Sequence, residues 1–175
     1  MKKDFKKIIP KRFHEVSYEN DVSEVVKAAM LNQLRERNGL FIVGNTGVGK
    51  THIACAMAKY ILEQGFDVLF YNTGKLLELL RDEFGKDEEK CLFKEILDFK
   101  GVLILDDIGA EKPSAWAIER LYLIINDKYE SMTPMIFTTN CEKEDLMNTL
   151  GDRIVSRITG MTLKVRIPGQ DRRIN

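Results

Sequence analysis

The sequence lacks the features that would place it in a membrane or in an oxidising compartment. No apolar run approaches the ~18 residues of a transmembrane helix, and the basic N-terminus has no apolar core of a signal peptide. These absences predict a cytoplasmic protein. Cys55, Cys91 and Cys141 are odd in number, widely spaced and without a C-x-x-C pair. Reduced thiols packed as small hydrophobic groups are therefore expected.

Net charge and a metal-binding cluster are also missing. The 27 Lys and Arg residues balance 27 Asp and Glu residues, so any nucleic-acid binding needs a local basic patch. His14 and His52 have no partner at metal-ligand spacing. What is present, 175 residues with 44% hydrophobic and 31% charged, suits one domain with a sizeable core.

One stretch carries a phosphate-binding motif, GNTGVGKT, which fits G-x-x-x-x-G-K-[ST]. Its glycines allow positive φ angles and a close approach of the backbone to an anion. Successive N–H groups then form a concave nest at the start of a helix. Lys50 is predicted to reach the β- and γ-phosphates, and Thr51 to ligate Mg²⁺. The motif consists of Gly44, Asn45, Thr46, Gly47, Val48, Gly49, Lys50 and Thr51.

The flanks of this loop fit the same interpretation. Residues 40–43 form a short apolar run, which predicts a buried strand before the loop. After the loop, apolar residues recur at helical spacing from Ile53 to Leu62 and the pattern stops at Gly65. A chance glycine-rich turn would not require this strand and helix, so nucleotide binding is predicted.

A second informative stretch is VLILDD, residues 102–107. Four apolar residues that end in acids are typical of a buried parallel strand with carboxylates at its carboxyl end, where ligands bind in open α/β sheets. Asp106 is predicted to hold Mg²⁺, and Asp107 to position the attacking water. Alone this pattern is weak, but it follows a phosphate loop by some fifty residues.

The remaining chain alternates helical and strand patterns. Residues 1–13 carry six basic residues against Asp4, which fits either an arm that contacts phosphate or a solvated terminus. The domain is expected to span residues 14–175. Helices are predicted at 22–34, 74–84, 91–99 and from Pro113 to Tyr129, strands at 66–71, 135–137 and 161–167, and a charged turn at 82–90.

Polar and cationic residues near the end of the chain extend the candidate site. Asn140 follows the 135–137 strand and is predicted to bond the attacking water or the γ-phosphate. Arg153 and Arg157 lie one helical turn apart. Arginines outside their own nucleotide pocket are usually surface residues, but phosphoryl transfer often uses an added guanidinium.

Several segments in this order resemble bacterial replicative helicase loaders of the DnaC/DnaI type and the related IstB transposition ATPases. These segments are GNTGVGKTHIA, LILDDIGAEKPSAW, IFTTN, GDRIVSRI and GQDRR. The resemblance covers residues 9–173. It implies an AAA+ P-loop NTPase fold of the α/β class, with a five-stranded parallel sheet in the order 5-1-4-3-2, flanking helices and no separate lid domain. It also implies an extra helix within residues 74–99.

The resemblance also assigns roles. Lys50 and Thr51 correspond to Walker A, Asp106 and Asp107 to Walker B, Asn140 to sensor 1 and Arg157 to an arginine finger that acts on a neighbouring subunit. His52 joins the nucleotide-binding segment, and Arg173 resembles a sensor-2 arginine. The implied activity is Mg²⁺-dependent ATP hydrolysis by a head-to-tail oligomer that engages single-stranded DNA.

Two departures and two alternatives accompany this resemblance. Loaders usually carry an N-terminal domain that grips the replicative helicase, and none is apparent in these 175 residues. Where relatives often have Asn-Asp-Arg-Tyr, Lys128 replaces the arginine and is a weaker substitute if that position needs a forked, bidentate donor. The main alternative is an IstB-like ATPase that regulates a transposase on duplex DNA. A metabolic P-loop kinase would need a lid and an acceptor-binding subdomain, which the sequence does not show.

Overall fold

A computed structural model describes residues 5–83, 91–110, 113–169 and 171. Its centre is a five-stranded sheet in which every pair of neighbours is parallel. The strand order β2-β3-β4-β1-β5 is the predicted order 5-1-4-3-2 read from the other edge, so this prediction is confirmed. The strands are β1 (Gly39–Val43), β2 (Val68–Asn72), β3 (Val102–Asp106), β4 (Met135–Thr139) and β5 (Thr162–Arg166).

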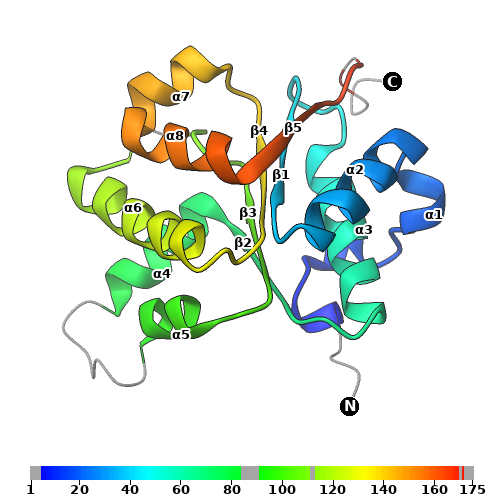
Figure 1. Cartoon of the computed structure of the whole chain (residues 1–175), viewed down its shortest axis with the longest axis horizontal. Helices are drawn as coiled ribbons and strands as arrows, with labels where there is room; N and C mark the ends of the chain where they lie inside the picture. Colours follow the sequence, from blue (N-terminus) through cyan, green and yellow to red (C-terminus); the bar gives the residue numbers. More distant parts are fainter. Residues whose placement is uncertain (1–4, 84–90, 111–112, 170, 172–175) are drawn as a thin grey trace.

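Helices cover both faces of the sheet (Figure 1). On one face lie α1 (Tyr18–Asp21), α2 (Glu24–Arg35) and α3 (Lys50–Glu63). On the other face lie α4 (Thr73–Asp82), α5 (Leu92–Asp98), α6 (Ala115–Glu130), α7 (Lys143–Leu150) and α8 (Asp152–Met161). Two short 3-10 turns, η1 (Phe5–Lys7) and η2 (Lys11–Phe13), precede them.

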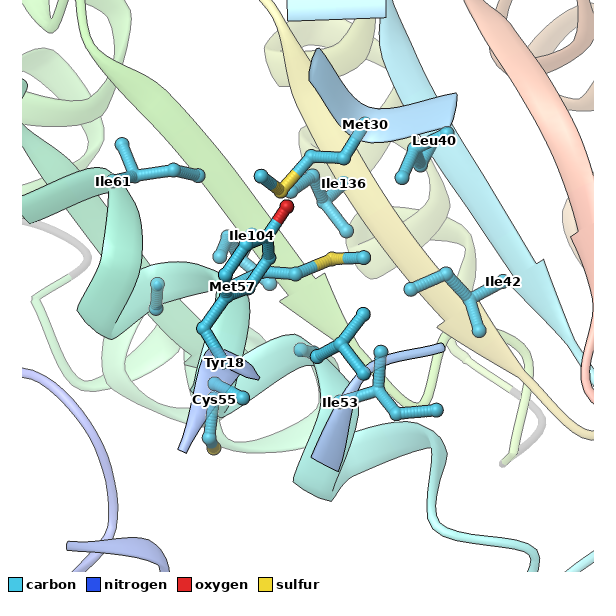
Figure 2. Close-up of a cluster of buried hydrophobic side chains, with 14 of the residues drawn as sticks. Tyr18, Met30, Leu40, Ile42, Ile53, Cys55, Met57, Ile61, Ile104 and Ile136 are labelled. Atoms are coloured by element: carbon cyan, nitrogen blue, oxygen red, sulfur yellow. The ribbon is translucent and has the colours of Figure 1, made fainter. Parts of the chain in front are cut away.

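Two hydrophobic cores form because successive side chains of a strand point to opposite faces. In β1, Leu40 and Ile42 join the core under α3, whereas Phe41 and Val43 join the core under α6 and α8. Figure 2 shows part of the first core, to which Met57 and Ile53 of α3 and the strand residues Ile104 and Ile136 contribute. The central strands β1, β3 and β4 are buried along their whole length.

The N-terminal segment packs onto the first core. Ile9 is buried there, and Phe5, Ile8 and Phe13 pack against the same core. The described residues 5–13 therefore contact the domain along one side. The division of the chain at residues 13 and 14 stays a prediction.

Some local predictions need correction. Helix α7 is not predicted by the sequence pattern, because it buries only Leu146 and Leu150. Strand β5 is present, but it lies at the edge of the sheet and Leu163 is exposed, so its apolar residues do not share one buried face. Residues 84–90, most of the predicted charged turn, lie outside the described residues.

Lys128 has a structural position that its sequence pattern does not indicate. Its side chain is fully buried, and its Nζ donates hydrogen bonds to the carbonyl oxygens of Leu97 (2.8 Å) and Phe99 (2.9 Å) at the end of α5. It also donates to Asp127 Oδ2 at 3.1 Å. Burial lowers the pKa of the Lys128 ammonium group. The three bonds tie α6 to the end of α5, so an ammonium group suits this position without a forked donor.

Candidate nucleotide-binding site

The phosphate loop joins β1 to α3 and has the geometry of an anion-binding nest. Gly47 and Gly49 have φ angles of 77° and 100°, a region that side chains with a Cβ rarely adopt. Helix α3 begins directly afterwards, at Lys50. Its first N–H groups have no partner within the helix, so the loop and the helix end together favour a phosphate.

Lys50 is held against its own loop. Its side chain is only 7% exposed, and its Nζ donates to the carbonyl oxygens of Gly44 and Asn45, both at 2.8 Å. These bonds keep the ammonium group beside the nest. The predicted phosphate-binding cation is therefore already positioned at the loop.

Asp106 lies at the carboxyl end of β3, beside the first turn of α3. Thr51 Oγ1 donates to both carboxylate oxygens, at 3.0 and 3.1 Å, and Thr138 Oγ1 donates to Oδ1 at 2.7 Å. Asp106 is 5% exposed. Burial raises the pKa of its carboxyl group, and the hydrogen bonds from Thr138 and Thr51 oppose that shift.

The pair Thr51 and Asp106 fits a magnesium ion. A hydroxyl and a carboxylate are hard oxygen ligands of the kind that Mg²⁺ prefers beside nucleotide phosphates. The two groups come from sequence positions 55 residues apart, yet they touch. The donor set therefore suits the ion that the sequence predicts.

Asp107 differs from its neighbour in exposure and in backbone conformation. Its side chain is exposed, and its φ angle is 63°, a left-handed conformation that Asp and Asn tolerate better than most residues. Its N–H donates to Thr138 Oγ1 at 2.8 Å, and the N–H of Ile108 donates to the Thr138 carbonyl at 2.9 Å. These contacts turn the Asp107 side chain away from the buried strand end.

Thr138 connects the two acids and is not predicted as a site residue by the sequence pattern. Its hydroxyl accepts from the Asp107 N–H and donates to Asp106. The side chain is fully buried in β4, so its place follows from the pairing of β3 with β4. A Thr-Thr-Asn stretch at a strand end is the only sequence signal, and that signal points to Asn140 as readily.

Asn140 lies across the site from the strand that bears the acids. Its Nδ2 donates to Thr46 Oγ1 of the phosphate loop at 3.4 Å, and its side chain is exposed. Thr139, one residue before it, is fully buried and donates to the Ile108 carbonyl at 2.7 Å. The rigid end of β4 therefore holds Asn140 at the mouth of the loop.

These residues line one cavity of about 490 Å³. Lys50, Thr51, Asp107 and Asn140 all contribute to its wall. The N-terminal segment closes one side with residues that the sequence pattern does not single out: Arg12, Phe13 and Asp21.

His52 links this N-terminal wall to the start of α3. Its Nε2 lies 3.0 Å from Asp21 Oδ2, and its ring makes an edge contact with Phe13 at 6.1 Å between centroids. His52 lines the same cavity. The predicted cofactor-binding residue is thus also a contact between α3 and α1.

Arg157 does not line this cavity. It lies on α8, where its Nε donates to Asn126 Oδ1 of α6 and its Nη1 donates to the Arg153 carbonyl. The Arg157 guanidinium lies 4.9 Å from the ring centroid of Tyr122. In the described part of the chain Arg157 forms no ion pair.

Arg173 lies outside the described residues. The neighbouring Asp171 is described, and its carboxylate packs against the phosphate loop. A Cβ added to Gly47 would lie 1.8 Å from Asp171 Oδ1. The end of the chain therefore approaches the loop, although the predicted role of Arg173 stays a prediction.

A doubly wound parallel sheet, with a phosphate loop after β1 and paired acids after β3, defines an ATP-binding AAA+ P-loop protein. The model of the IstB-like ATP-binding protein family matches residues 6–174. This chain belongs to that family.

Relatives from two groups bear on the function. Replicative helicase loader DnaC of Escherichia coli (strain K12) is 28% identical over 118 residues, which are 66% of this chain and 47% of that protein. The ATP-binding protein of insertion sequence IS1162 from Pseudomonas fluorescens is 34% identical over 103 residues, 59% of this chain and 44% of that protein. A crystal structure of the DnaC helicase loader matches with a TM-score of 0.79 and 30% identity, covering 91% of this chain and 100% of that chain.

The chain spans about half the length, or less, of these curated relatives. In the described ranges no helix has both the length and the apolar character needed to cross a membrane. The comparisons identify an ATP-binding AAA+ module related to helicase loaders and to insertion-sequence ATP-binding proteins.

Proposed function

We propose that this module hydrolyses ATP with Mg²⁺ and acts as the motor domain of a helicase loader. The observation that carries the proposal is the contact of Thr51 and Thr138 with Asp106, which joins the phosphate loop to the paired acids. Bound Mg²⁺ would neutralise charge on the phosphates. Thr51 and Asp106 are the residues that would hold it.

Asp106 and Asp107 have different roles in this reaction. Asp106 is buried and takes two hydroxyl donors, which suits a metal ligand. Asp107 is exposed and faces the cavity, which suits a group that orients water. Asn140, at the mouth of the loop, aids that orientation, and Lys50 exchanges its carbonyl partners for phosphate oxygens.

Arg157 acts on the ATP of a neighbouring subunit. It lies outside its own cavity, carries no compensating carboxylate among the described residues, and is held by Asn126 and Tyr122. A positioned guanidinium outside its own cavity suits a partner's phosphate. Head-to-tail assembly follows, because the donor and the receiving cavity lie on different surfaces of one chain.

Single-stranded DNA is the proposed polymer, and a cluster of arginines and half-buried aromatic rings on α4, α5 and α6 supports it. Arg81 and Arg120 lie 5.8 and 5.7 Å from the ring centroid of Trp116, and Arg120 also lies 5.0 Å from that of Phe93. Arginines bind phosphates and aromatic rings stack with unpaired bases. The replicative helicase is the proposed protein partner, by relation to the helicase loaders.

The second candidate is regulation of a transposase on duplex DNA, favoured by the match to an insertion-sequence ATP-binding protein. Fluorescence anisotropy with labelled single-stranded and duplex DNA of one sequence separates the two. The loader function predicts tighter, salt-sensitive binding to the single strand that increases with a non-hydrolysable ATP analogue. Equal or tighter binding to the duplex would favour the transposase function.

Subunit mixing tests the hydrolysis mechanism. Arg157→Ala and Lys50→Ala should each be inactive alone, while their mixture forms junctions with an intact loop and an intact arginine. The arginine contributes ~10³-fold or more to turnover in comparable enzymes. Partial recovery of ATPase activity supports the action in trans. Normal turnover by Arg157→Ala, at concentrations where the parent assembles, contradicts it.

A further inference from the structure

A second cavity, of about 730 Å³, lies at the opposite edge of the sheet from the ATP site. It is bounded by the C-terminal ends of α2 and α3 and by the loops that precede β2, β3 and β4. None of the proposed nucleotide-binding residues contributes to its wall. The cavity is therefore separate from the ATPase chemistry.

The wall of this amino-edge groove is mainly apolar and partly uncovered. Phe66 is 67% exposed and Met132 is 57% exposed, and Tyr60, Leu34 and Pro134 also line the groove. Single exposed apolar residues are common, but an aromatic ring and a thioether that border one groove form a contiguous apolar patch. Such patches mark binding sites for partners.

The charged residues of the groove wall all have one sign. They are Arg35, Arg37 and Lys100, with no Asp or Glu. The whole chain has 27 basic and 27 acidic residues, so a wall of one sign does not follow from the composition. The nearby acids Glu36 and Asp67 do not line the groove.

The backbone contributes charge of the opposite sign, but less of it. The C-terminal ends of α2 and α3 each carry a partial charge of about −0.5, against three full positive charges on the wall. The groove therefore favours an occupant with negative charge. The occupant must also cover a mainly apolar wall, which a segment that combines apolar and acidic side chains does.

We propose that the amino-edge groove binds an acidic amphipathic segment of a partner protein. Apolar side chains of the segment pack between Phe66 and Met132, and its carboxylates pair with Arg37 and Lys100. This mode resembles the general way in which amphipathic segments lie in hydrophobic grooves. The inference goes beyond the proposed ATPase function and does not depend on it.

A peptide selection tests the proposal. A random 12-residue library displayed on phage is selected on the immobilised full chain, and enriched sequences are synthesised with a fluorescein label. The expected sequences combine Glu or Asp with Leu, Phe or Met. Phe66→Ser/Met132→Ser and Arg37→Glu/Lys100→Glu should each weaken binding about tenfold or more, because each removes a pair of central contacts.

Matched controls lie elsewhere on the surface. Val25→Ser removes an apolar side chain that is exposed on α2, and Lys75→Glu/Lys143→Glu makes the same change of net charge at two other exposed lysines. Both should leave binding unchanged, and circular dichroism should show all variants folded. Equal weakening by the controls would show non-specific attraction and overturn the proposal.

Several other results would overturn the proposal. Enriched peptides that are basic or uncharged, peptides that bind independently of the groove, or no enrichment would each overturn the proposal. Sedimentation of the parent and of Phe66→Ser/Met132→Ser identifies a second copy as the occupant: if self-association is lost in the variant, the groove is a subunit interface. Preferential binding of labelled single-stranded DNA to this groove would likewise replace the peptide.

Discussion

The two edges of the same sheet have opposite characters. At the carboxyl edge, strands β3 and β4 end in Asp106, Thr138 and Thr139, which are buried yet hydrogen-bonded. At the amino edge, β1 begins at Gly39, whose backbone lies close to that of Met135 in β4. The groove beside it is lined by apolar and basic side chains. The strands are five residues long, so the character changes over a short distance.

The two edges therefore meet different requirements: ligand binding at the carboxyl edge, and packing at the backbone contacts of the amino edge. Residues at the carboxyl edge are selected by what a phosphate and a metal ion need, so their loss should remove activity more than stability. At the amino edge, the close backbone contact at Gly39 is needed for packing, so a larger residue there should reduce stability more than activity. Substitutions at the two edges test that separation.

The largest expected effect is at the carboxyl edge. Lys50→Ala should abolish ATP binding or hydrolysis, because it removes the ammonium group that is held beside the phosphate nest. Stability should change little, and thermal unfolding should show this. Lys100→Ala, at the amino edge, is the control and should keep full turnover. A Lys50→Ala protein with the parent's ATPase rate would refute the site.

A smaller loss is expected from Asp107→Asn. The variant should bind ATP but hydrolyse it ~10²–10⁴-fold more slowly, the range for a lost group that positions a proton or a water. Asn also tolerates the left-handed backbone at this position. Asp106→Asn should instead weaken Mg²⁺-dependent nucleotide binding. Nucleotide titrations and turnover measure both, and identical behaviour of the two variants would contradict the division of roles.

At the amino edge, Gly39→Ala should destabilise the fold by about 3 kcal/mol or more, as overpacking against backbone does. A Cβ there would lie 1.7 Å from the Met135 carbonyl oxygen. Chemical denaturation measures the loss, and the folded fraction should still bind nucleotide. Gly160→Ala is the control, because its nearest contact is the movable Tyr129 ring at 3.2 Å. If Gly39→Ala lost nucleotide binding without losing stability, the proposed difference between the two edges would be wrong.

The smallest effect is a gain of stability in Asp106→Asn. Burial raises the pKa of this carboxyl in the folded protein, so the folded state binds the proton more tightly than the unfolded state. The ionised group therefore opposes folding increasingly as the pH rises from the unfolded pKa through the folded pKa, and fully above it. The variant should resist denaturant better at neutral pH, with no advantage in strong acid. An advantage that grows toward acid pH would contradict this sign.

The local sequence was sufficient to predict the parts of the site whose conformation depends on residues close by in the chain. Gly47 and Gly49 have the expected positive φ angles, and the apolar run before Asp106 is the buried β3. Strand order required the family resemblance, since periodicity does not specify which strands pair. The joint role of Thr138 depends on the pairing of β3 with β4, which brings residues 31 and 32 positions apart into contact.

Other features depend on tertiary packing alone. Lys128 is buried because the end of α5 presents two carbonyl groups to α6, and nothing near it in sequence indicates this. Arg12 and Phe13 reach the nucleotide cavity because Ile9 anchors their segment in the core. Helix α7 is too short for its two buried residues, Leu146 and Leu150, to form a recognisable pattern. Each of these features is set by contacts between distant segments.

The bonds from Lys50 to the carbonyls of Gly44 and Asn45 have a consequence for the rate of nucleotide capture. A loop that is already closed around its own cation loses little conformational freedom when a triphosphate arrives. The entropic barrier to association is then small, and the ammonium group exchanges one set of oxygens for another. Encounter, rather than rearrangement of the loop, should therefore limit how fast the empty protein reloads.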